Sequence, residues 1–140
     1  MKRIIACLLL IAPLTANADN WLCIGEQSTG FFLEGGAWEI TGFNPGKYLI
    51  KPSDDVTKLM DNAAVYQVHS FGNETQSWIC PDFIEGKLVC YGFAARGDTF
   101  KYNRETGNFL TTTTMGYVET LKGKVSEDTP LIEIGKCSKL

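Results

Sequence analysis

Reactive and metal-binding residues are scarce in this sequence. Among 140 residues there is a single histidine, His69. It alternates with Tyr66 and Val68, on the opposite strand face, so we expect it to be a partly exposed surface residue rather than a general base with a partner. The chain also lacks G-x-S-x-G, H-E-x-x-H, Walker and G-x-G-x-x-G patterns. These absences predict a protein that is not an enzyme and needs no cofactor.

Two further features are missing: a zinc-type cysteine spacing and a long hydrophobic run. No Cys-x-x-Cys occurs, and one histidine is too few to replace it, which argues against a zinc site. The apolar run at residues 4–14 is shorter than the roughly 20 residues of a spanning helix. It follows the basic residues 2–3 and precedes the small-x-small pattern at 16–18, which is typical of a cleaved secretory signal peptide.

The organisation predicted is therefore a signal peptide at 1–18 and one domain at 19–140, exported to the periplasm or secreted by a Gram-negative bacterium. The mature chain would hold 11 basic and 16 acidic residues, a formal charge of −5. A mildly acidic chain without a Lys/Arg stripe is a poor candidate for binding nucleic acid, and we expect no membrane insertion after cleavage. The partner expected is an unknown protein or a small apolar ligand.

Four cysteines remain in the mature chain, an even number that predicts two disulfides in an exported protein. Spacing alone allows three pairings. We favour Cys80–Cys90, because a hairpin with the three-residue loop 84–86 would place Phe83 opposite Lys87 and these two cysteines face to face. Cys23–Cys137 would then tie the chain ends together.

The remaining sequence reads as short strands and tight turns. Alternation and β-branched residues predict strands near 21–24, 31–33, 38–40, 47–51, 65–70, 99–102, 108–114 and 131–134. Residues 27–30 are expected to turn the chain between the first two. Gly35-Gly36 predicts a hairpin with Leu33 opposite Trp38, and a four-residue loop after Tyr102 would pair it with Phe109. Residues 53–62 are the one helix candidate, with Ser53 as N-cap.

About nine or ten short strands in one small domain predict an all-β fold. Mostly tight turns favour an antiparallel meander closed into a small barrel, and a two-sheet sandwich is the alternative. Most aromatic residues should then fill the core, although some could line a cavity for an apolar ligand. The loop 94–98 joins two strands and carries Arg96 and Asp98, which we assign as the tentative binding residues because recognition often resides in such loops.

Several motifs resemble a group of small exported proteins of Gram-negative bacteria and their phages that have no assigned activity. The resemblance lies in Trp21-x-Cys23, in the turns at 28–31 and 106–109, and in the ending 129–137. It implies the compartment and the fold, and it transfers no functional residue. The periplasmic C-type lysozyme inhibitors are similar only in size, export and architecture, and their Ser-Gly loop has no counterpart at 94–98.

Three classes of function follow from these patterns. The first is a non-catalytic exported binding or interaction protein, for which an inhibitor similar to the lysozyme inhibitors would be one case. The second is a barrel that carries a small apolar ligand, and the third is an enzyme without a familiar motif. A filled interior would favour the first class and a wide apolar cavity the second.

Overall fold

The computed structural model describes residues 19–53, 58–59, 62–63, 65–72, 76–92, 97–114, 120–121, 124–125 and 129–140. The predicted signal peptide at 1–18 lies outside these residues. Nine strands form the main sheet: β1 (Trp21–Glu34), β2 (Ala37–Gly42), β3 (Lys47–Pro52), β6 (Tyr66–Ser70), β7 (Gln76–Cys80), β8 (Lys87–Gly92), β9 (Thr99–Asn103), β10 (Asn108–Thr113) and β13 (Leu131–Lys139).

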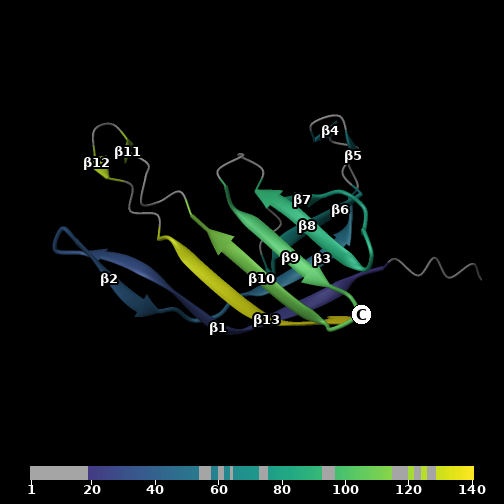
Figure 1. Cartoon of the computed structure of the whole chain (residues 1–140), viewed down its shortest axis with the longest axis horizontal. Coiled ribbons are helices and arrows are strands. Elements are labelled where there is room, and N and C mark those ends of the chain that lie inside the picture. Colours follow the sequence, from purple (N-terminus) through teal and green to yellow (C-terminus); the bar gives the residue numbers. More distant parts are fainter. Residues whose placement is uncertain are drawn as a thin grey trace, which may run out of the picture.

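The main sheet closes on itself and forms a β-barrel (Figure 1). Its hydrogen-bonded order is β13-β10-β9-β8-β7-β6-β3-β1-β2, and β13 also pairs with β1. Eight antiparallel strands therefore make a closed barrel, and β2 is an additional strand outside it. This confirms the predicted all-β barrel over the two-sheet sandwich.

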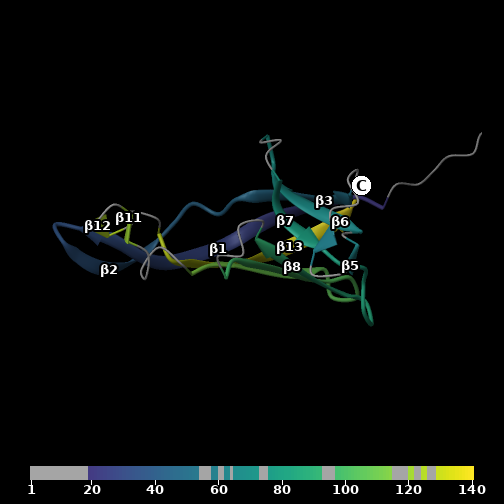
Figure 2. The same cartoon turned by 90° about the horizontal axis from the view of Figure 1, so that it is seen from above.

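The longest strand, β1, belongs both to the barrel and to a protruding hairpin. Its first half pairs with β3 and β13, and its second half pairs with β2 from Thr29 to Glu34. The register shifts between Gly25 and Gln27, as expected of a bulge that bends the strand. Residues 29–42, which we call the arm, extend away from the barrel (Figures 1 and 2). The turn predicted at residues 27–30 is wrong, because β1 continues through them.

Local turn chemistry accounts for the hairpin registers. Gly35 and Gly36 both have positive φ, and Leu33 faces Trp38 as predicted. The predicted pairing of Tyr102 with Phe109 is also confirmed.

The hairpin between β7 and β8 differs from its prediction in the turn. Trp78 pairs with Gly92 and Ile79 with Tyr91, which places Cys80 opposite Cys90 as expected. The loop itself has two residues, Glu85 and Gly86 with φ of 49° and 73°, so that Ile84 rather than Phe83 faces Lys87. Residues 81–83 lie outside the strands and take up the one-residue difference, which Pro81 favours because it cannot donate to a ladder.

The helix predicted at residues 53–62 is not supported by the described residues of that segment. The described part of this segment forms two short paired strands, β4 (Lys58–Leu59) and β5 (Asn62–Ala63), so pairing overrides the helical spacing of the apolar residues. A similar pair, β11 (Thr120–Leu121) and β12 (Lys124–Val125), lies further along the chain. No helix among the described residues is long and apolar enough to cross a membrane.

Aromatic rings fill the barrel. One cluster joins Trp21, Tyr66, Phe83 and Tyr102, with ring centroids 5.1–6.2 Å apart. A second joins Tyr48, Trp78, Phe100 and Phe109 at 5.2–5.7 Å. The buried aliphatic core residues Ile50, Val68 and Leu88 belong to the same core. Eight aromatic residues thus lie in the core or pack against it, whereas Phe31, Phe32, Phe71 and Tyr91 are exposed.

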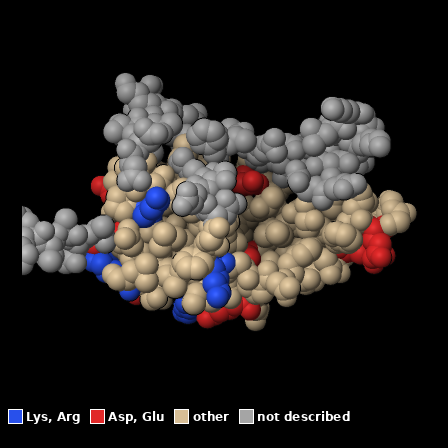
Figure 3. Space-filling model, turned by 180° about the vertical axis from the view of Figure 1, so that it is seen from behind, with Lys and Arg blue, Asp and Glu red and all other residues tan. Residues whose placement is uncertain are grey.

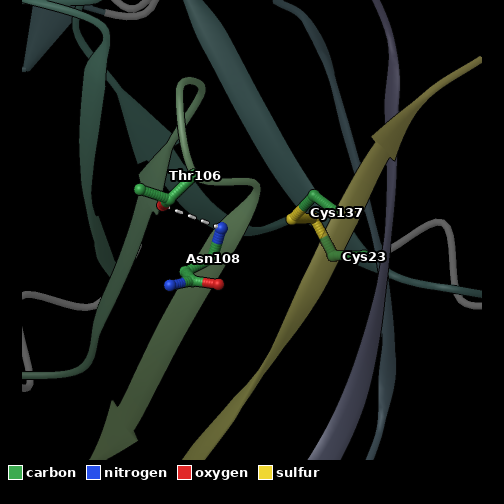
Figure 4. The surroundings of a disulfide bond; sticks show 4 residues. All are labelled: Cys23, Thr106, Asn108 and Cys137. Atoms are coloured by element: carbon green, nitrogen blue, oxygen red, sulfur yellow. Dashed lines mark hydrogen bonds between the residues drawn. A yellow bond between two sulfur atoms is a disulfide. The ribbon is translucent and has the colours of Figure 1, made fainter.

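Both predicted disulfides are present. Cys23–Cys137 joins β1 to β13, where the two cysteines are direct cross-strand partners (Figure 4). Cys80–Cys90 joins β7 to β8 across a sequence separation of only 10 residues. The first bond spans 114 residues and therefore constrains far more of the unfolded chain. Two disulfides are compatible with an oxidising extracellular or periplasmic compartment.

We predict that loss of the long-range disulfide destabilises the protein more than loss of the short one. Chain-entropy models give about 4–5 kcal/mol for a loop of the length closed by Cys23–Cys137, against about 3 kcal/mol for that closed by Cys80–Cys90. The two stability losses can be measured by urea unfolding of the double variants Cys23→Ala/Cys137→Ala and Cys80→Ala/Cys90→Ala. Equal midpoints, or a larger loss for the Cys80–Cys90 pair, would contradict the prediction.

Candidate functional site

Three places in the described structure could carry function: a groove on the outer face of the barrel, an apolar patch on the arm, and a buried carboxylate near the arm. Each is built by the alternation of side chains along neighbouring strands, in which residues of one face follow at every second position.

The groove lies across four strands that are far apart in sequence. Successive strand pairs place Val89 beside Lys101, Lys101 beside Leu110, and Leu110 beside Ile134. Their neighbours inside the barrel, among them Leu88, Tyr102 and Phe109, are buried. The outward-facing residues Val89, Lys101, Leu110 and Ile134 therefore lie on strands whose inward-facing side chains are packed in the core. We call this depression the outer groove; its volume is about 560 Å³, and its outward-facing lining consists of Glu26, Lys87, Val89, Lys101, Asn103, Asn108, Leu110, Ile134 and Lys136.

The outer groove combines apolar and basic side chains: Lys101 lies between Val89 and Leu110 in one row, and Lys87 and Lys136 lie in the next row. Lys87, Lys101 and Lys136 are exposed, and the ammonium group of Lys136 donates to the side-chain oxygen of Asn108. Glu26, at the bulge of β1, is the one acidic residue among the described residues that line it. A surface that combines apolar side chains with cations suits a partner with both apolar and acidic groups.

The arm carries a different surface. On the face that continues the outside of the barrel, Phe31 is 46% exposed and its cross-strand partner Ile40 is 79% exposed. A shallow apolar groove of about 330 Å³ joins them to Ile132 and Thr112. Glu34 and Glu39, near the tip, lie on the opposite face of the arm. In Figure 3 acidic side chains stand at the end of the arm, whereas the lysines and arginines in view lie over the barrel.

Glu133 is a buried carboxylate near the point where the arm leaves the barrel. It is 3% exposed, and it sits opposite Ser28 on β1 and Thr111 on β10. The backbone N–H of Gly46 donates to its Oε1 atom at 3.1 Å, and the hydroxyl of Tyr48 is a second hydrogen-bond partner. Gly25 leaves the space that the carboxylate fills, since a Cβ atom there would collide with Glu133 Oε1 and approach Pro45 to 2.7 Å.

Burial is the main cause of the pKa shifts of Glu133 and Tyr48. Desolvation raises the pKa of Glu133 above its ordinary value, although the hydrogen bonds from Gly46 and Tyr48 act in the opposite direction. Burial, and then the adjacent carboxylate, raise the pKa of the Tyr48 hydroxyl as well. Because Glu133 is closed off from solvent, its geometry fits a contact that holds the loop at 43–46 against β13.

Some buried polar atoms have no partner in the described part of the chain. Both ring nitrogens of His69 and the indole Nε1 of Trp78 belong to this group. His69 is only 8% exposed, so its predicted place at the surface is wrong. Gln67 and His69 do share one face of β6, but that face is buried as well as the face of Val68, which the alternation within one strand does not reveal.

The residues predicted to bind a partner are only partly described. Arg96 lies outside the described residues. Asp98 has a structural part: its carboxylate accepts from the backbone N–H of Thr114 at 3.2 Å, and its carbonyl accepts from Gly92 at 2.9 Å. No cluster of three His, Cys, Asp or Glu residues that could hold a metal occurs among the described residues. The outer groove was not anticipated, because its three lysines come together only through the strand registers.

Comparisons with known proteins do not indicate a function for this chain. No family model matches the chain, and neither a curated protein nor a solved structure matches it.

We predict that Glu133 makes the protein less stable as the pH rises. The folded-state pKa of Glu133 is raised above the unfolded-state value, so the folded protein binds this proton more tightly, and the contribution of Glu133 to the free energy of unfolding falls as the pH passes upward through that window. The Glu133→Gln variant should lack this component. Urea unfolding of both proteins between pH 4 and pH 7.5 should show the variant gaining on the wild type with rising pH. A constant difference would contradict the raised pKa.

Proposed function

We propose that this chain is an exported, non-catalytic binding protein that contacts its partner through the outer groove. The observation that carries the proposal is the groove itself, in which Lys101 lies between the apolar residues Val89 and Leu110, and Lys87 and Lys136 lie in the neighbouring row. Exposed lysines beside apolar side chains favour a partner whose contact segment is acidic and partly apolar, since opposite charges steer the encounter and the apolar side chains supply burial.

The interior of the barrel supports contact at the surface over carriage of a ligand. The core side chains of the described strands pack ring against ring, with every centroid distance in the two aromatic clusters at 6.2 Å or less. A carrier needs an enclosed space of several hundred cubic ångströms, and the two grooves formed by described residues are on the outside. The disulfide that joins the chain ends keeps this outer surface on a rigid frame.

Export is part of the proposal. The N-terminal pattern at residues 1–18 supports it, and the two disulfides agree with an oxidising compartment. In such a compartment a small protein with a fixed surface can act by occupying part of another protein, without chemistry of its own.

Charge reversal in the groove tests the function. We expect Lys101→Glu to abolish binding of a short oligo-glutamate peptide, because it places a negative charge between Val89 and Leu110 in the middle of the groove. The matched control is Lys47→Glu, which makes the same change at an exposed position on β3 that does not line the groove. Both variants should unfold within about 0.5 kcal/mol of the wild type, as surface substitutions usually do.

Peptide-induced shifts of the backbone amide signals on β9, β10 and β13 provide the measurement. They should appear in the wild type and the control and weaken as salt rises toward 0.5 M, where charges are screened over about 4 Å. Affinity capture from an extracytoplasmic extract with the same three proteins then identifies the natural partner. If the peptide shifts signals elsewhere, or if Lys101→Glu binds as well as the control, the groove is not the binding surface.

A further inference from the structure

The outer strand β2 ends the hydrogen-bonded order of the main sheet. The eight barrel strands each have a partner on both sides, whereas β2 pairs with β1 alone. Six consecutive residue pairs, from Thr29–Gly42 to Glu34–Ala37, hold it in a regular register without a bulge. One edge of β2 therefore has no strand beside it in that order.

This edge has few of the features by which proteins usually prevent edge pairing. Such edges are commonly protected by charged side chains, above all lysine, by proline, by a bulge or by a very short strand. The sequence of β2, Ala37-Trp38-Glu39-Ile40-Thr41-Gly42, contains neither lysine nor proline, is six residues long and has Glu39 as its one charged residue. Ile40, near its centre, is the most exposed large hydrophobic residue of the described structure, at 79%.

The backbone of Ile40 is directed toward this edge. In an antiparallel pair, residues alternate between those whose N–H and C=O bond the neighbouring strand and those whose groups point the other way. A two-residue turn of the type formed by Gly35 and Gly36 makes Glu34–Ala37 a hydrogen-bonded pair. Phe43, six residues on, also donates toward β1, to the carbonyl of Ser28 at 3.0 Å. Ile40 has the opposite parity, so its N–H and C=O face outward.

We propose that β2 pairs with β2 of a second copy of this chain, antiparallel and about a two-fold axis normal to the sheet. An isologous contact of this kind places one residue opposite itself. Ile40 fits that position, because its outward N–H and C=O can exchange two hydrogen bonds with those of Ile40 in the second copy. The exposed side chains of the two Ile40 residues then lie side by side on the same face.

Charge selects this register over its neighbour. With Ile40 opposite itself, Glu39 faces Thr41 of the second copy, and Trp38 faces Gly42, which leaves room for the indole ring. A shift to the adjacent two-fold register nearer the tip would set Glu39 opposite Glu39, and like charges directly across a sheet are destabilising. The adjacent register on the other side would set Thr41 opposite Thr41, and a fast homodimer of Thr41→Cys would reveal it. The shape of the molecule also permits the contact, since the arm projects from the barrel (Figures 1 and 2) and antiparallel pairing puts the two barrels at opposite ends.

Sedimentation velocity over a range of protein concentrations tests the proposal. The wild-type protein should form a dimer as its concentration rises to about 0.5 mM, in the affinity range of contacts smaller than standard interfaces. Ile40→Pro removes the outward N–H, which an edge strand tolerates, and should weaken dimerisation at least about tenfold. Ile40→Val keeps the N–H and the β-branched side chain and should dimerise almost as the wild type. Near-UV circular dichroism and the melting temperature confirm that both variants are folded.

Cysteine cross-linking tests the register. Glu39→Cys and Thr41→Cys proteins, mixed and mildly oxidised, should form a disulfide-linked heterodimer much faster than either forms a homodimer. A fast Glu39→Cys homodimer would overturn the Ile40-centred register. A wild-type protein that stays monomeric throughout the concentration range, or an Ile40→Pro variant that dimerises as strongly as the wild type, would overturn the pairing itself. None of these outcomes depends on whether the outer groove binds an acidic partner.

Discussion

The antiparallel ladder between β1 and β13 is the constraint on which the rest of the structure depends. It joins the first and last strands of the described domain, so the barrel closes only if this ladder forms in register. Two features fix that register. Cys23 and Cys137 are direct partners, and Gly135 allows close packing, since a Cβ atom there would collide with the carbonyl of Ile24 and the ring of Phe109. Closing a ladder between segments far apart in the sequence has a large cost in loop entropy, and the Cys23–Cys137 disulfide lowers that cost by restricting the unfolded chain.

The arm and the buried carboxylate are consequences of the same ladder. β13 follows β1 beyond the bulge at Glu26 as far as Gly30, whose tight packing against Pro130 and Leu131 leaves no room for a side chain. Past that point the outer strand β2 is the one strand that pairs with β1 among the described residues. Glu133 lies where β1 changes its partners, and its contacts with Gly46 and Tyr48 hold the connection between β2 and β3 against β13. A charge whose burial is unfavourable is thus placed at the junction, where hydrogen-bond donors from β3 and its preceding loop can reach it.

Sequence reasoning succeeded where the structure is decided locally. Gly35-Gly36 and the residues after Tyr102 define tight turns, and the registers that follow from them need no knowledge of distant strands. Cys80 faces Cys90 as predicted, although the turn of that hairpin is one residue shorter than predicted and residues 81–83 take up the difference. It failed where a distant partner decides. Residues 27–30 resemble a turn, yet pairing with 131–134 keeps them extended. The helical spacing of 53–62 gives way to strand pairing, and His69 is buried by tertiary structure. Lys87, Lys101 and Lys136 look like ordinary solvent-facing residues until three ladders bring them into one groove.

Because aromatic side chains pack the interior of the barrel, both proposed binding surfaces lie on the outside of the molecule. The outer groove and the edge of β2 differ in the interactions that they offer to a partner. The lysines of the outer groove are exposed to solvent, so the proposed affinity of the groove for an acidic partner would fall as ionic strength rises. The edge of β2 offers backbone groups and an uncharged isoleucine, which salt screens very little. The groove lies on the barrel and the edge on the arm, and no residue of β2 lines the groove. Two-fold pairing through the arms would then present two basic grooves on one rigid particle, and a partner with two acidic segments would gain affinity from binding both.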